Sequence, residues 1–316
     1  MIKKTIDVLC FGLMVCDLIA KPVNKSVFDV DSSRIENIKI TSGGDALNTA
    51  INIARLGSSV SMAGIIGCDM MGSFLEDEVV KNGIDTSHLI KSNEYSTSTC
   101  IVLVDKNGDR HFVYYGKAND ALHPEHISDD AINNARIVHL GSAMALENIE
   151  GKGLANLFSK AKIAGAITSM DVTWDSSGKW LKRIDEALYY TDLFLPSLQE
   201  AKMISGADTY EEMEMFFKKY GLSILVVKLG EKGCFVTDFH ERHVIPAFYV
   251  ENVVDTTGAG DAFVSGFLTG VLHGMGIYKC GVLGNAVAAN CVKEIGATTS
   301  NLCLDEIMEL VNNYNY

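Results

Sequence analysis

A glycine-rich segment near the C-terminus has the residue types of an anion-binding loop. Residues 255–263 read DTTGAGDAF, and an apolar helix is predicted directly after them. The backbone N–H groups of Gly258, Ala259 and Gly260 can approach an anion closely, and the positive end of the helix dipole adds to the attraction. Asp261 stands beside them, where a carboxylate could accept the proton of a hydroxyl that attacks a phosphoryl group. A plain glycine turn with an N-capping aspartate would have the same spacing, and these residues alone leave both interpretations open.

A second glycine pair leads into a predicted helix near the N-terminus. The segment 42–48 reads SGGDALN, so the backbone at Gly43 and Gly44 can come close to a ligand. Asp45 and Asn48 offer hydrogen bonds of the kind that vicinal hydroxyl groups take. Neither a G-x-G-x-x-G fingerprint nor a G-x-x-x-x-G-K-[ST] motif occurs at a strand-to-helix turn, which argues against a Rossmann dehydrogenase.

The composition limits the classes of partner. The 316 residues carry 27 Lys and Arg against 40 Asp and Glu, a formal net charge of −13 that should repel nucleic acid and anionic membranes. The eight cysteines include no CxxC pair and mostly lie in apolar runs, which is typical of reduced thiols in a cytoplasmic protein. Because no long apolar run reaches the length of a membrane span, we expect a cytoplasmic protein.

Strands alternate with helices along most of the chain. The near-continuous apolar run 6–16 indicates a strand buried on both faces of a sheet, and residues 46–56 carry apolar side chains at helical spacing. The alternation predicts an α/β fold with a mainly parallel, doubly wound sheet. The later strands are expected at 60–66, 137–140, 166–171, 193–195 and 223–229, and the later helices at 71–82, 149–164, 198–205 and 264–272.

Two stretches break this alternation. Residues 18–40 and 97–116 show strand-like patterns without a helix, and DKNGD at 105–109 is a strong hairpin turn between 99–104 and 110–115. We expect them to form a small antiparallel sheet. Standing over the carboxyl ends of the main strands, where open α/β folds bind ligands, this sheet would act as a lid.

Further segments connect the two glycine motifs in a fixed order. They are GLMVCD at 12–17, GCDMMG at 67–72, NGDR at 107–110, GKAN at 116–119 and KLG at 228–230. With DTTGAGD at the end, this set resembles the ribokinase-like, or PfkB, family of carbohydrate kinases over nearly the whole chain. The wording GGDALN is similar to that of poorly characterised bacterial sugar kinases. The resemblance implies a single ribokinase-like domain over residues 1–316 that transfers a phosphoryl group from ATP to a sugar hydroxyl.

The resemblance implies roles on the acceptor side. Asp261 would be the general base, and the backbone of Gly258–Gly260 would form the anion hole. Asn119 would either contact substrate or cap a turn where the lid returns. The alternative interpretation of Asp17 is a solvated carboxylate. The expected substrate-binding residues are Asp17, Gly43, Gly44, Asp45 and Asn48.

The resemblance also implies a nucleotide site. It places Lys228 and Gly230 near the phosphates and ribose, and Asn285 on a helix beside the adenine. The family's Asn-x-x-Glu element, which organises Mg²⁺, appears here as SLQE, so Ser197 replaces the asparagine and Glu200 is kept. Glu200 would act on Mg²⁺ through water. A surface lysine and an ordinary helix-start glutamate are the alternative interpretations of Lys228 and Glu200.

Two more expectations rest on the resemblance alone. Many family members bind K⁺ beside the anion hole, mostly through backbone oxygens, and the exposed face of the lid makes a homodimer plausible. The positions that match the potassium site are Asp255, Thr257, Cys291, Glu294, Gly296 and Ser300.

Two other functions stay open beside the ATP-dependent sugar kinase. A nucleoside kinase of the same fold would need an aromatic pocket for the base, which Tyr114 and Tyr115 could supply. A non-catalytic sugar-binding regulator would have no need for a base at Asp261. The expected partners are a small sugar, ATP with Mg²⁺ and K⁺, and neither nucleic acid nor a membrane.

Overall fold

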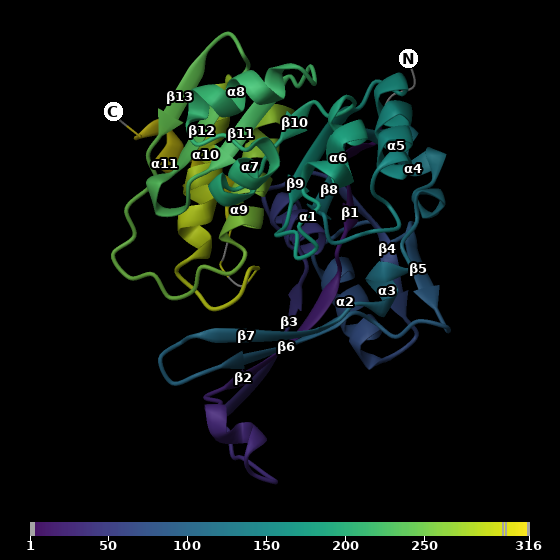
Figure 1. Ribbon diagram of the computed structural model, residues 1–316, viewed down its shortest axis with the longest axis vertical. Coiled ribbons are helices and arrows are strands. Elements are labelled where there is room, and N and C mark those ends of the chain that lie inside the picture. The colour runs from purple at the N-terminus through teal and green to yellow at the C-terminus, as the bar shows by residue number, and fades with distance from the viewer. Residues whose placement is uncertain (1–3, 299, 301, 315–316) are drawn as a thin grey trace.

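A computed structural model describes residues 4–298, 300 and 302–314. The chain forms a large sheet with helices on both faces and a small sheet that projects from it (Figure 1). The strands are β1 (Ile6–Gly12), β2 (Val15–Lys21), β3 (Asn37–Gly43), β4 (Val60–Gly67), β5 (Leu89–Ser92), β6 (Thr99–Val104), β7 (Arg110–Tyr115), β8 (Ala135–Ala143), β9 (Ile167–Val172), β10 (Leu193–Phe194), β11 (Ile224–Lys228), β12 (Cys234–Thr237) and β13 (Arg242–Ile245). The helices are α1 (Asp45–Arg55), α2 (Met70–Lys81), α3 (Lys117–Asp120), α4 (Asp129–Asn134), α5 (Lys152–Ile163), α6 (Leu181–Leu188), α7 (Leu198–Ser205), α8 (Tyr210–Lys218), α9 (Ala259–Leu272), α10 (Ile277–Cys291) and α11 (Leu304–Asn312), with 3₁₀ turns η1 (Lys25–Phe28), η2 (Pro124–His126) and η3 (Gly230–Lys232).

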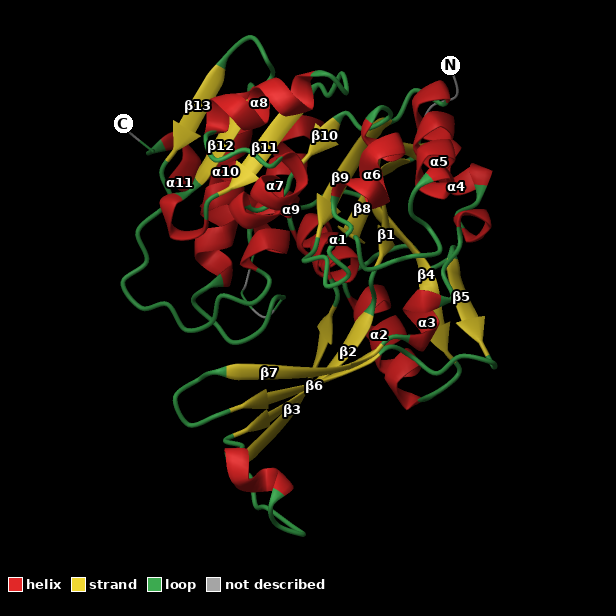
Figure 2. Cartoon of the chain, in the orientation of Figure 1, coloured by secondary structure: helices red, strands yellow, loops and turns green. Residues whose placement is uncertain are grey.

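The large sheet is parallel over most of its width. Among the described residues its order is β13-β12-β11-β10-β9-β8-β1-β4-β5 (Figure 2). At one edge, β12 runs antiparallel to both of its neighbours, β11 and β13. All other neighbouring strands pair in parallel. The predicted doubly wound α/β sheet is therefore confirmed, and the antiparallel edge adds to it. None of the described helices has the length and apolar character needed to cross a bilayer.

Strand β1 shows why the sheet is covered on both faces. Val8 and Cys10 pack into one hydrophobic core, whose helical residues come from α1, α2, α9, α10 and α11. Leu9 and Phe11 point the other way, into a core built with α4 to α8. Because side chains alternate along a strand, a strand between two helical layers must be apolar at every position.

The apolar run 6–16 was predicted as one strand, and this boundary is wrong. The chain leaves the large sheet at Gly12 and starts β2 at Val15, which belongs to the small sheet. An apolar run without polar turn residues cannot show where one buried strand ends and the next begins. The helix expected from residue 149 begins later, at Lys152, and α9 begins earlier than its apolar stretch, at Ala259.

The small sheet has the order β3-β2-β6-β7 and projects from the body (Figure 1). The β6–β7 hairpin spans the predicted residues, and β2 pairs with β3 in the same antiparallel sense. A parallel pairing of β2 with β6 joins the two antiparallel pairs. We call this sheet the lid. Its inner face carries Asp17, Ile19, Val102 and Arg110, which line a cavity against the body.

Candidate active site

Polar side chains gather at the carboxyl ends of the parallel strands. Lys228 is the last residue of β11, Asp171 lies one residue before the end of β9, and helix α9 begins close to both. This end of an open parallel sheet is where α/β folds bind ligands. The structure thus brings Gly260 and Lys228 close together, and their shared role in one site stays a prediction.

Asp261 lies in the first turn of α9 with only 8% of its surface exposed. Nδ2 of Asn48 in α1 donates a hydrogen bond to its Oδ2 at 2.8 Å. Burial, and then the charge of Asp45, raise the pKa of Asp261 well above its ordinary value. A buried carboxylate with a raised pKa is a stronger proton acceptor than an exposed one.

The loop before Asp261 exposes the start of α9 to a ligand. Gly258 has a φ of 74°, and a Cβ at that position would lie 2.1 Å from Cβ of Ala297, so both conformation and space require glycine. A Cβ at Gly260 would lie 3.5 Å from Nζ of Lys228. The ammonium group and the first N–H groups of the helix are thus close together, as an anion site requires.

Lys228 is held by a carboxylate that sequence analysis did not select. Its Nζ donates to Oδ1 and Oδ2 of Asp171 at 2.7 and 2.6 Å. Burial alone would lower the pKa of Lys228, but Asp171 and Glu200 hold that pKa above its ordinary value. Lys228 is therefore a charged group whose side chain is 14% exposed and held in an ion pair, which argues against a free surface lysine.

Ser197 and Glu200 form a capping box at the start of α7. The N–H of Ser197 donates to Oε2 of Glu200 at 2.7 Å, and the serine hydroxyl accepts from the N–H of Glu200 at 3.4 Å. The charge of Glu200 also acts on Asp171 and Lys228. A carboxylate beside the anion hole is a group that Mg²⁺ takes together with phosphate oxygens, so Glu200 fits that ion, whereas both oxygens of Asp171 are engaged by Lys228.

A cleft of about 730 Å³ opens next to the anion hole. Lys228, Gly230 and Asn285 line it, as the nucleotide prediction expected. Asn285 in α10 also donates to the carbonyl oxygens of Ile245 and Pro246 at 3.2 and 3.0 Å. Apolar side chains line most of the remaining wall and suit a flat aromatic base: Ala247, Phe248, Val250, Val253, Phe263, Ala288, Ala289 and Val292.

The acceptor-side residues lie where the lid meets α1. The carboxylate of Asp17 in β2 lies against Gly43, where a Cβ would be 2.1 Å from Oδ2 of Asp17. Gly44 precedes α1, and Asp45 is the first residue of that helix. Burial, and then the charge of Asp45, raise the pKa of Asp17 to about 7. Because Asp45 also raises the pKa of Asp261, the three carboxylates share one region of the site.

Asn119 in α3 has a structural role at the base of the lid. Its side chain accepts from the N–H of Met14 at 3.2 Å and donates to the Met14 carbonyl at 3.0 Å. It also donates to the hydroxyl of Tyr114 at 3.0 Å. Asn119 therefore fastens the junction between β1 and the lid, and its contact with substrate stays a prediction.

Asp255 holds the loop that leads to the anion hole. It is buried and accepts hydrogen bonds from the N–H groups of Thr257 at 2.7 Å and Gly296 at 2.9 Å. Nη2 of Arg110, from the lid, forms an ion pair with Oδ1. Burial alone would raise the pKa of Asp255, but the bonds from Thr257, Gly296 and Arg110 hold it below its ordinary value.

Other positions of the expected potassium site also meet protein donors. Nη1 of Arg55 donates to the carbonyl oxygens of Thr298 and Ser300. The thiol of Cys291 lies 3.7 Å from the carbonyl oxygen of Thr257, while Glu294 is exposed. Two of the six expected positions therefore already contact arginines, Asp255 through its carboxylate and Ser300 through its carbonyl oxygen, and these guanidinium groups would compete with a K⁺ ion there.

Known proteins resemble this chain in sequence and in fold. The pfkB family carbohydrate kinase profile matches residues 5–302. The chain belongs to the PfkB family of carbohydrate kinases. An uncharacterised sugar kinase of Archaeoglobus fulgidus is 33% identical over 251 residues, which cover 78% of this chain and 96% of the relative.

Solved structures agree with the PfkB assignment. The fructokinase of Xylella fastidiosa with bound ATP superposes with a TM-score of 0.83 at 25% identity, covering 97% of this chain and 98% of that one. The ribokinase of Arabidopsis thaliana complexed with ribose and ATP has a TM-score of 0.83 at 23% identity, covering 98% of this chain and 100% of the other. The latter likeness shows the fold.

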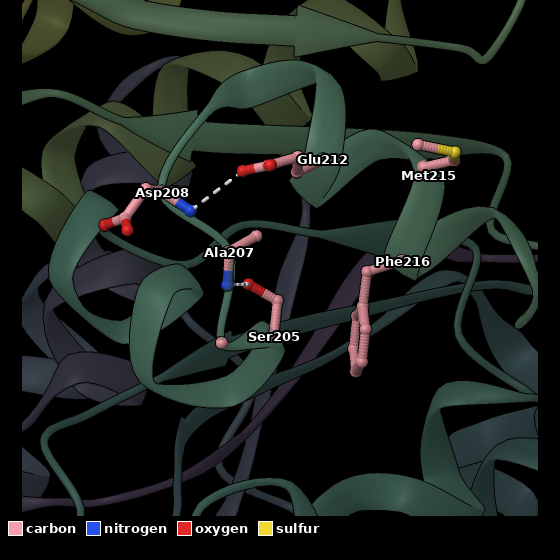
Figure 3. Close-up of a pocket in the computed structure, with 7 residues that line it drawn as sticks. Ser205, Ala207, Asp208, Glu212, Met215 and Phe216 are labelled. Carbon is pink, nitrogen blue, oxygen red and sulfur yellow. Dashed lines mark hydrogen bonds between the residues drawn. The ribbon is translucent and has the colours of Figure 1, made fainter.

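A further hollow of this PfkB kinase, of about 500 Å³, lies between α7 and α8 (Figure 3). The hydroxyl of Ser205 accepts from the N–H of Ala207 at 3.1 Å, and Glu212 accepts from the N–H of Asp208 at 3.2 Å. Both bonds hold the short loop that joins the two helices. The hollow lies at the C-terminal end of α7, about 7.5 Å along the helix axis from Glu200, and it shares no lining residue with the cleft beside Lys228.

Sequence analysis missed Asp171 and Arg55 and gave Arg110 no role. A signal for Asp171 was present, because it ends a predicted parallel strand and such ends meet at the ligand edge. Arg110 and Arg55 carry no comparable signal. Their partners are carboxylate and carbonyl oxygens of a distant loop, which only the folded chain brings near.

Proposed function

We propose that this PfkB kinase transfers the γ-phosphoryl group of ATP to a hydroxyl of a small neutral sugar or sugar derivative, with Asp261 as the general base. The observation that carries the proposal is the position of Asp261. It is buried, oriented by Asn48 at 2.8 Å, and placed in the same turn as the anion hole beside Lys228. A structural N-cap would need none of these three features.

ATP would lie in the cleft lined by Lys228, Gly230 and Asn285, with its phosphates directed toward Gly258–Gly260. The N–H groups at the start of α9 and the ammonium of Lys228 then stabilise the charge that develops on the phosphoryl oxygens. Asp171 keeps that ammonium in place through two short hydrogen bonds. Mg²⁺, when bound with ATP, would be held through water by Glu200 and would neutralise phosphate charge.

The acceptor would bind between α1 and the inner face of the lid. Asp17 and Asp45 accept hydrogen bonds from hydroxyl groups, and Oδ1 of Asn48 is buried without a partner among the described residues. Asp261 accepts the proton of the attacking hydroxyl. The lid excludes water, which would otherwise take the phosphoryl group. Any charge that these three carboxyl groups carry would repel an anionic acceptor, which favours a neutral one.

The test is ADP release by the purified protein with MgATP across pentoses, hexoses, ketoses, sugar acids, phosphorylated sugars and nucleosides. Turnover on a neutral sugar supports the proposal, and preference for a nucleoside would replace it with the nucleoside kinase. Of the two tyrosines that could form an aromatic pocket for a nucleoside base, Tyr114 faces the same side of the lid as Asp17. The strand register puts Tyr115 on the other face. ATP binding without turnover on any acceptor would support the regulator, and no ATP binding would refute the proposal.

The lid supports the proposal of a homodimer. The strand register puts Leu18, Ile40, Ile101 and Val113 side by side on its outer face, and the last three are exposed. An apolar sheet face of this kind is covered by a partner more often than left in water. Light scattering should give twice the monomer mass, and Ile101→Lys should give the monomer. A monomeric wild type at micromolar concentration would refute the lid contact.

The eight cysteines support a cytoplasmic location, where ATP is available. All eight are free thiols, and six of them are buried. Burial raises the pKa of Cys16 and Cys100, which flank the acceptor region, to about 11. Such thiols are unreactive, as expected in a reducing compartment.

A further inference from the structure

The loop that makes the anion hole contains a buried negative charge close to where the phosphates would bind. Asp255 precedes Gly258 by three residues, and its carboxylate fixes the loop by accepting from the N–H groups of Thr257 and Gly296. An unpaired carboxylate at this place would repel the transferred phosphoryl group and would cost folding energy. The loop therefore needs a positive charge beside Asp255.

Two arginines supply positive charge where the resemblance led us to expect K⁺. Nη2 of Arg110 pairs with Oδ1 of Asp255. Nη1 of Arg55 reaches the carbonyl oxygens of Thr298 and Ser300, in the segment after α10 that also holds Gly296, an N–H partner of Asp255. A guanidinium group is a permanent cation with directed donors, so it can neutralise the carboxylate and order the backbone together.

Arg110 comes from the lid, which makes the charge depend on the lid position. It is the first residue of β7 and lines the cavity of about 140 Å³ between lid and body, opposite Asp255 and Thr257. When the lid is in place, the guanidinium contacts the loop that presents the anion hole. A closing movement that covers the acceptor would therefore also complete the electrostatics of phosphoryl transfer.

We propose that Arg110, assisted by Arg55, replaces the monovalent cation in this chain, so that turnover does not require K⁺ and the lid delivers the positive charge. Arg110 is a positioning residue, because it acts on the phosphoryl group through Asp255 and the loop. The inference rests on the proposed function for its kinetic part only. Its second part, that the wild-type loop has no affinity for K⁺, can be measured without ATP or sugar.

The first measurement uses the free protein. Melting temperatures are compared in KCl and in choline chloride at equal ionic strength, for the wild type, Arg110→Gln and Lys106→Gln. Lys106 is exposed in the same hairpin and loses the same charge, so it is the matched control. The wild type and Lys106→Gln should melt at the same temperature in both salts, whereas Arg110→Gln should be stabilised by K⁺. Selective stabilisation of the wild type by K⁺ would overturn the proposal.

The second measurement is turnover in the same salts on an accepted sugar. The wild type should differ by less than about twofold between KCl and choline chloride, and Arg110→Gln should lose about tenfold or more in choline because Asp255 is left unpaired. KCl should restore part of that loss, and Arg110→Lys should keep turnover independent of K⁺. Strong activation of the wild type by K⁺, or an Arg110→Gln protein that responds to salt as Lys106→Gln does, would overturn the proposal.

Discussion

Asn48 donates a hydrogen bond to Asp261 across 213 residues of sequence, at 2.8 Å, and so joins the start of α1 to the start of α9. The two glycine motifs of the chain meet through this contact. The first lies beside Asp17 and Asp45, which we propose face the sugar, and the second is the proposed anion hole. A base fixed between the two ligand regions can meet the acceptor hydroxyl on one side and the phosphoryl group on the other.

Replacement of Asp261 by Asn should separate catalysis from binding. We expect Asp261→Asn to lower kcat by about 10²–10⁴-fold, the usual contribution of a general base, while ATP affinity stays unchanged. The variant should also melt at a higher temperature, because the raised pKa of Asp261 means that the folded protein is destabilised at neutral pH by keeping it charged. Steady-state kinetics, nucleotide titration and thermal melting test this, with exposed Asp109→Asn as control. Turnover equal to the control would exclude Asp261 as the base.

The pH profile should report the same carboxylate. Turnover requires charged Asp261, so kcat/KM should rise with pH, and its acid limb should lie above the ordinary Asp value of 3.8. Asn48→Leu removes a hydrogen bond that lowers the pKa of Asp261 and should move the limb to higher pH. Asp45→Asn removes a charge that raises this pKa and should move the limb to lower pH. Shifts in the same direction for both variants would contradict the assignment.

Local features of the sequence were sufficient for the catalytic loop and the lid hairpin. DTTGAGD and DKNGD carry their own turn chemistry, so the expected anion loop before α9 and the strands 99–104 and 110–115 agree with the structure. The strand ending near Asp171 was also predicted, yet its carboxylate was not selected. A single Asp at a strand end has the same local pattern whether it faces solvent or pairs with a buried lysine.

Features that depend on distant partners could not be predicted in this way. The apolar run 6–16 is divided between two sheets. At the break, the backbone N–H and carbonyl of Met14 hydrogen-bond to the side chain of the distant Asn119 and not to a neighbouring strand. Arg110 was visible only as part of a hairpin motif, and its pairing with Asp255 follows from the fold of the lid onto the body. Likewise, only the folded chain brings the expected potassium ligands Asp255 and Ser300 next to Arg110 and Arg55.

Addition of a methyl group at Gly43 should damage acceptor binding selectively. In Gly43→Ala the new Cβ would lie 2.1 Å from Oδ2 of Asp17, so the carboxylate has to move. We expect KM for the sugar to rise by about tenfold or more, while KM for ATP stays the same, since a displacement of about 1 Å can be that costly. Asp17→Asn should have a similar effect, and the double variant should be little worse than either single one. Additive losses would show that Gly43 does not act through Asp17.

A buried ion-pair network outside the proposed site should control stability. Arg183 in α6 donates to Glu150, with Nη2 at 3.0 Å from Oε1, and to Oδ1 of Asp175 at 3.0 Å, and all three side chains are at most 8% exposed. Arg183→Met leaves two buried carboxylates unpaired and should cost about 3–5 kcal/mol in the free energy of unfolding. Arg242→Met, which removes a half-exposed arginine from looser pairs, should cost less than about 1 kcal/mol. Urea titration measures both, and kcat of the folded Arg183→Met protein should be unchanged. Equal losses in the two variants would mean that the buried network contributes no more than a surface pair.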